Sequence, residues 1–122
     1  MKLNLIHQDN RGRILSLISD NFFYPEVTIF ETNAGFARGG CVHNINDEYC
    51  TVISGQVEYV IGDELHILSD GMSIKIPKGT PHYFISWGYS VVLEWGATVE
   101  EKGEKHKEFR QIVDRINDSQ LL

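Results

Sequence analysis

Two separate clusters in this sequence contain residue types that bind transition metals. Cys41, His43 and Glu48 lie close together, and His82 ends a second cluster that is rich in glycine and proline. Neutral imidazole and carboxylate are ligands for Zn, Fe, Ni, Mn and Cu, and ligand softness alone does not choose among these metals. Two imidazoles and one carboxylate leave open coordination positions for water or substrate. We therefore predict a divalent transition metal at His43, Glu48 and His82, with a purely organic ligand as the alternative.

Cys41 is open to three interpretations. Its thiolate would be a strong metal ligand, or its side chain would be a small buried residue, as free cysteine often is. A hairpin that paired His43 with Glu48 across residues 44–47 would bring all three side chains of the first cluster together. The same hairpin would oppose Cys41 and Cys50, at a separation that suits a redox pair.

Short apolar runs separated by glycine-containing turns make up most of the chain. They are rich in Val, Ile, Tyr and Phe, which favour strands, and their near-regular spacing is typical of an all-β sandwich or barrel. Phe109, Ile112, Val113 and Ile116 then form one apolar stripe at helical spacing. We predict an amphipathic helix over residues 104–117, packed on the outside of the barrel or on a partner subunit.

The composition fits one globular domain, residues 1–122, and argues against several classes of partner. Hydrophobic residues make up 42% of the 122 and charged residues 23%, which is typical of a folded domain. A net charge of −6 argues against nucleic acid as a partner, and no apolar run reaches the roughly 20 residues that span a bilayer. The N-terminus has no apolar signal region, and two cysteines do not make a disulfide framework. We expect a cytoplasmic protein.

The two clusters resemble the paired motifs of the cupin superfamily. The first cupin motif, G-x5-H-x-H-x3/4-E-x6-G, is matched from Gly35 to Gly55, with Cys41 in place of its first histidine. The second, G-x5-P-x-G-x2-H-x3-N, is matched from Gly71 onward, with Ser86 in place of its final asparagine. Two motifs in this order and at this separation make the resemblance fairly specific.

The resemblance implies a small double-stranded β-helix, the cupin jelly-roll barrel, with a core over about residues 12–97 and the helix after it. Carried over by position, the metal ligands in the barrel mouth would be His43, Glu48 and His82, with Cys41 at the place of a further ligand. Such a metal would polarise a substrate oxygen. His43, His82 and Glu48 are also the predicted catalytic residues.

A weaker resemblance is to cupins that act on nucleotide sugars, the deoxysugar 3,5-epimerases and 3,4-ketoisomerases. It rests on Asp9-Asn-Arg-Gly12 and on Arg38-Gly-Gly immediately before Cys41. In ketoisomerases of this kind a pair of histidines does acid–base work without a metal, and the histidine of the second motif is often missing. This chain has one histidine of the pair and keeps His82, which favours the metal site.

Three functions are compatible with these patterns. The first is a metal-binding small cupin that binds or converts a small polar, carbohydrate-like metabolite. The second is a metal-independent nucleotide-sugar isomerase or epimerase, and the third is a non-catalytic ligand-binding cupin, so enzyme activity stays open. The predicted substrate contacts are one guanidinium and three aromatic rings: Arg38, Tyr49, Tyr59 and Phe84. We also predict a homodimer, in which residues 1–6 add to the sheet edge of a neighbour.

Overall fold

Eleven strands and one helix make up the part of the chain that the structure describes, residues 2–18, 26–96 and 103–120 of a computed structural model. In chain order they are β1 (Lys2–Asp9), β2 (Gly12–Ile18), β3 (Val27–Thr32), β4 (Ala37–Val42), β5 (Glu48–Ser54), β6 (Gln56–Ile61), β7 (Glu64–Ser69), β8 (Ser73–Ile76), β9 (His82–Ser86), β10 (Ser90–Trp95), β11 (Glu104–Lys105) and α1 (Lys107–Ser119).

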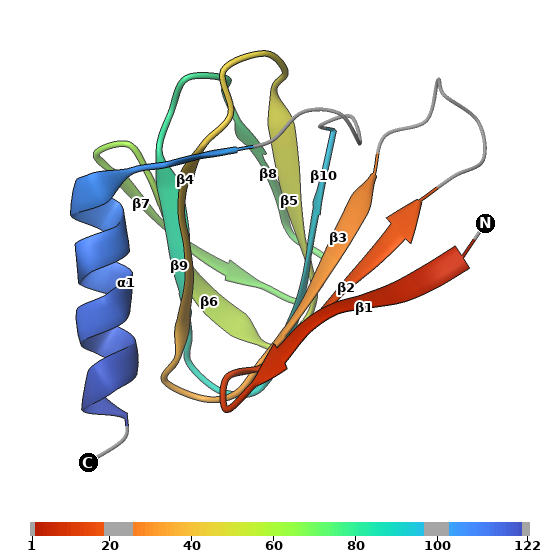
Figure 1. The fold of residues 1–122 in the computed structure, drawn as a ribbon, viewed down its shortest axis with the longest axis vertical. Helices are drawn as coiled ribbons and strands as arrows, with labels where there is room; N and C mark the ends of the chain where they lie inside the picture. The colour runs from red at the N-terminus through yellow and green to blue at the C-terminus, as the bar shows by residue number, and fades with distance from the viewer. Residues whose placement is uncertain (1, 19–25, 97–102, 121–122) are drawn as a thin grey trace.

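The strands form two antiparallel sheets that face each other as a barrel (Figure 1). The six-stranded sheet has the order β1-β2-β3-β10-β5-β8, and the five-stranded sheet has the order β11-β4-β9-β6-β7. Several neighbours in each sheet are far apart in the sequence, as in β3-β10-β5 and β4-β9-β6, which is the pattern of a jelly roll. The all-β jelly roll with a C-terminal helix, predicted from the sequence, is confirmed.

Alternating residues on the strands supply the core between the two sheets. In β6 the buried positions are Val57, Tyr59 and Ile61, every second residue, while their neighbours are less buried. Val52 of β5 and Val92 of β10 meet them from the six-stranded sheet. Full burial of such a side chain stabilises the fold by about 1.5–3 kcal/mol, so this layer holds the barrel closed behind its mouth.

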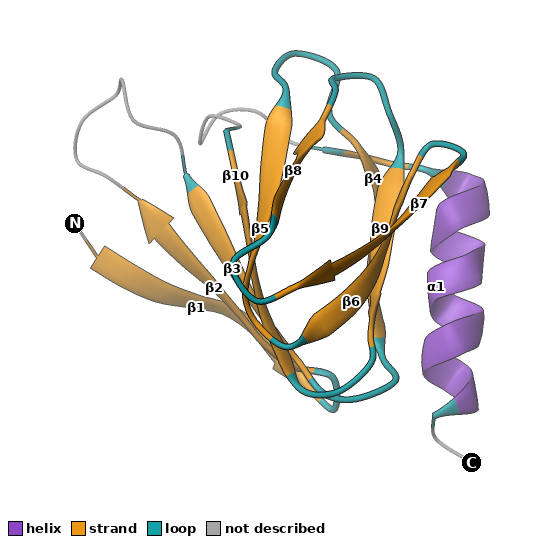
Figure 2. Cartoon of the chain, turned by 180° about the vertical axis from the view of Figure 1, so that it is seen from behind, coloured by secondary structure: helices purple, strands orange, loops and turns teal. Residues whose placement is uncertain are grey.

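The helix α1 packs its apolar stripe on the outer face of the five-stranded sheet, and Figure 2 shows it on the opposite side of the barrel from β1 and β2. Val113 is fully buried there, in a second small core with Ala37 and Tyr83. Of the two predicted locations for the helix, the structure shows packing on the outside of the barrel. The helix is too short and too polar to cross a membrane.

The helix begins at Lys107, later than the predicted residue 104. Glu104 and Lys105 extend instead as β11, which pairs with Val42 and Cys41 of β4. His106 then caps the helix, because its ring Nδ1 accepts the backbone N–H of Phe109 at 3.3 Å. The apolar stripe gives the face of the helix, but it does not locate this capping residue.

The predicted hairpin that pairs His43 with Glu48 is wrong. β4 pairs with β9 and β11, while β5 pairs with β10 and β8, so the chain crosses from one sheet to the other between β4 and β5. Cys41 lies opposite His82, and Cys50 lies opposite Ile74. Both cysteines are free, so the redox pair is absent. A short polar connection suits a hairpin or a crossover equally well, and the local sequence does not separate the two.

Candidate metal centre

Three potential ligand atoms converge where β4, β5 and β9 meet. His43 follows β4, Glu48 opens β5 and His82 opens β9. One ring nitrogen of each histidine and one oxygen of the carboxylate lie within 4.8 Å of one another. The distance from His43 Nε2 to Glu48 Oε1 is 3.1 Å, and from His82 Nε2 to the same oxygen 3.9 Å. The structure thus brings the three predicted ligands together from two facing sheets.

Backbone contacts between the two motifs hold this arrangement. The turn between β8 and β9 lies at the same end of the barrel as the connection between β4 and β5 (Figure 1). In that turn the N–H of Gly79 donates to the His43 carbonyl at 2.7 Å. The N–H of Lys78 donates to Asp47 Oδ1 at 2.9 Å. The proline–glycine turn of the second motif therefore braces the loop that carries the first histidine.

The ring of His82 is oriented by its own strand entry. Its Nδ1 lies 3.3 Å from the Thr80 carbonyl, which can only accept, so Nδ1 carries the proton of this bond. That contact directs Nε2 toward Glu48 and into the site. A ring nitrogen fixed on a carbonyl is the usual way in which proteins set the tautomer and direction of a metal-binding histidine.

Glu94 is a site residue that sequence reasoning missed, as it missed Arg11 and Arg110 in the cavity lining. Its Oε1 lies 3.4 Å from His82 Nε2, and its Oε2 accepts a hydrogen bond of 2.8 Å from the Tyr59 hydroxyl. On β10 it stands two residues after the fully buried Val92. Burying a carboxylate is costly unless it is paired. A glutamate on the core-facing side of a strand therefore indicates a functional residue, and this pattern in the sequence could have identified Glu94.

His82 and Glu94 contact each other in a largely buried setting. Burial acts to lower the pKa of His82, but the hydrogen bond and charge of Glu94 outweigh it, so the pKa lies above its ordinary value. Burial acts to raise the pKa of Glu94, and the contacts with His82 and Tyr59 outweigh it in turn, so that pKa is lowered. Each of the two groups therefore favours the charged form of the other.

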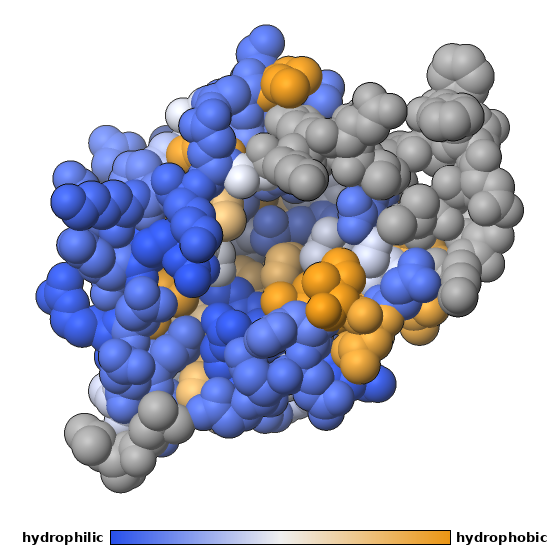
Figure 3. Space-filling view, viewed as in Figure 1, coloured by the Kyte–Doolittle hydropathy of each residue, from blue (hydrophilic) through white to orange (hydrophobic). Residues whose placement is uncertain are grey.

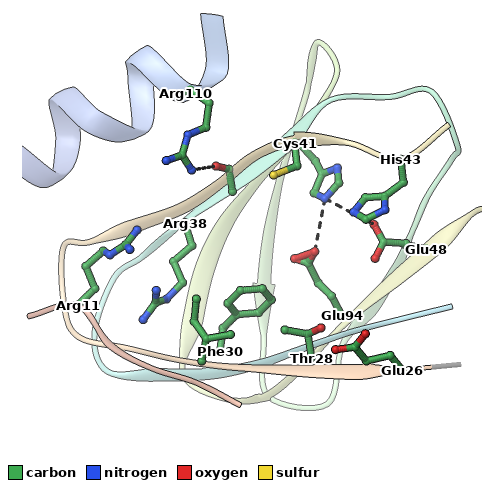
Figure 4. A pocket seen from close by; sticks show the side chains of 13 residues that line it. Arg11, Glu26, Thr28, Phe30, Arg38, Cys41, His43, Glu48, Glu94 and Arg110 are labelled. Atoms are coloured by element: carbon green, nitrogen blue, oxygen red, sulfur yellow. Dashed lines mark hydrogen bonds and ion pairs between the residues drawn. The ribbon is translucent and has the colours of Figure 1, made fainter. Parts of the chain in front are cut away.

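A cavity of about 300 Å³ opens beside these residues. The cavity is visible as a hollow in the space-filling view of Figure 3. Figure 4 shows the side chains that line it. Two groups face each other across it (Figure 4). The imidazole–carboxylate end consists of His43, Glu48, His82 and Glu94, and the arginine end consists of Arg11, Arg38 and Arg110.

Arg38, predicted to contact substrate, lines the cavity and is 1% exposed. Each of the two residues after it must be glycine, for a different steric reason. A Cβ at Gly39 would lie 2.8 Å from the Tyr83 Cα on the neighbouring strand, and a Cβ at Gly40 would lie 2.9 Å from the backbone nitrogen of Arg110. Both glycines have positive φ, of 111° and 86°. This segment therefore lets β9 and α1 approach β4 closely.

The three aromatic residues predicted as substrate contacts lie elsewhere. Tyr59 and Phe84 belong to the buried core, where their rings stack at 5.3 Å. Tyr49 stacks on Trp95 at 4.7 Å, on the side of β5 opposite to the buried Glu48 and its neighbour Cys50. None of the three is among the residues that line the cavity. Tyr59 reaches the site indirectly, through Glu94.

Cys41 lines the cavity next to the predicted ligands (Figure 4). Burial and the charge of Glu94 raise the pKa of its thiol, which favours the protonated form. It does not belong to the group of three whose donor atoms lie close enough to share an ion. A role as a ligand stays a prediction.

The residues present fit a divalent transition metal. Two imidazole nitrogens and one carboxylate oxygen converge, the Thr80 carbonyl fixes the ring of His82, and all three residues line the cavity. Two histidines with one carboxylate and open positions is a donor set that metal enzymes use for Zn and Fe. The same donors accept Mn, Ni or Cu, so they do not name the metal.

Comparison with known proteins assigns the class. Residues 37–96 match the family model described as the cupin domain. This span contains both motifs from Ala37 onward, with all three potential ligands and Glu94. The chain therefore contains a cupin domain, and its fold is that of the cupin superfamily. No curated protein matches the sequence at a significant level.

Solved structures agree with this fold. CapF, a capsular polysaccharide assembling protein of Staphylococcus aureus, has a TM-score of 0.72 at 18% identity over 86% of this chain and 34% of CapF. A cupin-2 domain protein of Rhodospirillum rubrum has 0.71 at 15% identity, over 85% and 74% of the two chains. Oxalate decarboxylase of Bacillus subtilis, described with Mn(II) centres, has 0.70 at 18%, over 84% and 29%. The chain thus spans about a third of CapF and of the decarboxylase.

Proposed function

We propose that this chain is a metal-binding cupin that binds or converts a small polar metabolite in its barrel. The observation that carries the proposal is the convergence of His43, Glu48 and His82 within 4.8 Å of one another beside the cavity. A divalent metal held there would act as a Lewis acid toward a ligand oxygen. A ligand of carbohydrate type is supported by the similarity to CapF, which is named for capsular polysaccharide assembly.

In this proposal each residue of the imidazole–carboxylate end has a distinct task. His43, Glu48 and His82 hold the ion, and their contacts across the two motifs keep the donor atoms in place before the ion binds. Glu94 lies against His82 and accepts the Tyr59 hydroxyl. It adds negative charge beside a cation, and it is positioned to hold or release a proton at the edge of the cavity.

A second candidate is a metal-independent isomerase or epimerase that acts on a nucleotide sugar. The close contact of His82 with the largely buried Glu94 favours it, because an imidazole beside a carboxylate is a common acid–base pair. Protein freed of metal with EDTA should then exchange the hydrogen next to the keto group of a 4-keto deoxysugar nucleotide with solvent deuterium. Absence of exchange, with the protein folded, contradicts this candidate.

Metal uptake tests the first proposal. We expect wild-type protein, dialysed against Zn²⁺ and then measured by atomic emission, to hold about one ion per chain. Glu48→Gln and His82→Ala should each weaken binding by at least about tenfold, since even the partners of metal ligands contribute 10–100-fold.

Glu64→Gln is the matched control for this experiment. Glu64 also contacts a histidine, His66, at 3.1 Å, but its side chain is 70% exposed and lies away from the site. This variant should bind Zn²⁺ as the wild type does. Uptake that is absent in the wild type, or equal in Glu48→Gln and Glu64→Gln, would overturn the proposal.

A further inference from the structure

Arg38 is a buried cation whose binding capacity is only partly used. Its guanidinium donates from Nε to Thr32 Oγ1 at 2.9 Å and from Nη2 to the Glu31 carbonyl at 3.0 Å. Nη1 is buried as well and has no hydrogen-bond partner. Both acceptors are neutral, and no carboxylate of the described residues forms an ion pair with it. A buried guanidinium without a counter-charge is costly.

Arg38 lines the cavity, so a ligand there could accept a hydrogen bond from its guanidinium. Figure 4 shows its guanidinium beside that of Arg11, across the cavity from Glu94. The guanidinium carbon lies 5.9 Å from the centre of the Phe30 ring, which lines the same cavity. Burial, with the nearby charge of Arg11, lowers the pKa of Arg38 to about 10, so the group stays charged at neutral pH.

The two other arginines of the arginine end differ in how far they are neutralised. Arg11 is held by Asp9 in a salt bridge of 2.7 Å, with two further contacts from its Nε. Arg110 donates from Nη1 to the carbonyl of Gly39 at 2.8 Å, and no carboxylate of the described residues is paired with it. The arginine end therefore has a surplus of positive charge at Arg38, with Arg110 adding to it.

From this geometry we infer that the arginine end binds the carboxylate of a small metabolite, through Arg38 and with the charge of Arg110. Arg38 matches a single negative charge. A phosphate dianion would need a second guanidinium in direct contact, and those of Arg11 and Arg110 are engaged by Asp9 and by the Gly39 carbonyl. The carboxylate would lie at the arginine end, and the rest of the ligand would extend toward His43 and Glu48. The inference rests on the proposed ligand-binding function, since it concerns the same cavity.

The test is a titration of wild-type protein, freed of metal with EDTA, followed through the arginine Nε–H signals in ¹H–¹⁵N spectra. Acetate should shift the Arg38 signal in a saturable manner. Acetamide, which has the same shape without the charge, should not, and inorganic phosphate should bind more weakly than acetate. Equal responses to acetate and acetamide, no saturable response to acetate, or tighter binding of phosphate would each overturn the inference.

Variants separate this site from a general effect of charge. Arg38→Gln should weaken acetate binding at least about tenfold, as expected for a lost charge-assisted hydrogen bond. Because Arg38 is buried and that variant can misfold, Arg110→Gln at the same end is the second variant, and it should weaken binding several-fold. Arg115→Gln removes an exposed charge from the same helix, outside the cavity, and should leave binding within about twofold. Equal effects of Arg110→Gln and Arg115→Gln would refute the site.

The result is independent of metal binding. Acetate binding without Zn²⁺ uptake would support the arginine site and contradict the metal centre. Zn²⁺ uptake without acetate binding would do the reverse.

Discussion

Glu94 links the chemistry of the site to the core of the barrel. One of its oxygens faces His82, and the other accepts the hydroxyl of Tyr59, a residue with no exposed surface. The carboxylate is therefore held from behind by a core side chain while it contacts a predicted ligand in front. An acceptor that is both buried and charged loses more than a surface group when its donor is removed.

Removing this donor should destabilise the fold. We expect Tyr59→Phe to lower the free energy of unfolding by about 1–3 kcal/mol, because the largely buried Glu94 would lose the hydroxyl that donates to its Oε2. Urea unfolding of metal-free protein measures the effect. Tyr83→Phe is the control, since Tyr83 is also nearly buried but its hydroxyl makes no hydrogen bond within the described residues. Equal losses for the two variants would contradict this role.

Residue patterns predicted part of the site and missed the rest for physical reasons. The spacing of His43, Glu48 and His82 was sufficient to group them, because each stands at the start or end of a strand near one end of the barrel. Glu94 stands alone in sequence, and only its place on the inward side of β10 reveals it. Tyr49 was predicted to contact substrate, yet strand alternation turns it away from Glu48.

At the scale of elements, α1 and β4 behave as one unit. The Asn117 side chain donates to the Ala37 carbonyl at 3.0 Å and accepts the Ala37 N–H at 2.8 Å. The helix therefore satisfies both backbone hydrogen-bonding groups of Ala37, as a neighbouring strand would. Arg110 adds a bond to Gly39. Because β4 supplies Arg38 and Cys41 and leads to His43, the helix supports the strand that carries the site.

The close approach of helix and strand depends on Gly40. We expect Gly40→Ala to lower the free energy of unfolding by at least about 1 kcal/mol, from positive φ alone. The added Cβ would also lie 2.6 Å from Cδ of Arg110 and 2.9 Å from its backbone nitrogen, and so push against the helix. Thermal or urea unfolding measures the loss. Gly88→Ala, with open space around its Cβ, should be near neutral, and a Gly40→Ala protein as stable as the wild type would contradict the argument.

Element order was harder to predict than element type. Apolar alternation and the helical stripe were sufficient to predict an all-β barrel with a C-terminal helix. They did not show that β4 and β5 lie in different sheets, because residues 43–47 are compatible with both connections. The predicted grouping of His43, Glu48 and His82 holds although the hairpin was wrong. Strands of two facing sheets meet at one end of the barrel as readily as two strands of a hairpin.

At the scale of the whole molecule, β1 presents an apolar strand edge at the surface. β1 is the outer strand of its sheet and pairs with β2 alone among the described strands. Leu3 and Leu5 are 54% and 57% exposed on it, and apolar side chains gather in the region of β1 and β2 (Figure 3). An exposed edge with apolar side chains is a template for pairing with a second chain. We propose a homodimer formed through β1.

This proposal predicts a dimer mass for the wild type in light scattering at micromolar concentration. Leu5→Glu should shift it to the monomer, because a charge on an edge strand opposes pairing. The matched control is Leu65→Glu, since Leu65 is 60% exposed on β7, the outer strand of the other sheet. A wild-type monomer, or dissociation caused by Leu65→Glu and not by Leu5→Glu, would contradict the interface.

The central claim is that His43, Glu48 and His82 hold one metal ion at the wall of the ligand cavity. A crystal of protein loaded with Zn²⁺ and measured at the zinc absorption edge tests it most directly. We predict one anomalous peak bonded to both imidazoles, at about 2.0–2.1 Å from each nitrogen, and to the carboxylate. A structure in which these three side chains are ordered and the peak is missing, or lies on other residues, would contradict the claim.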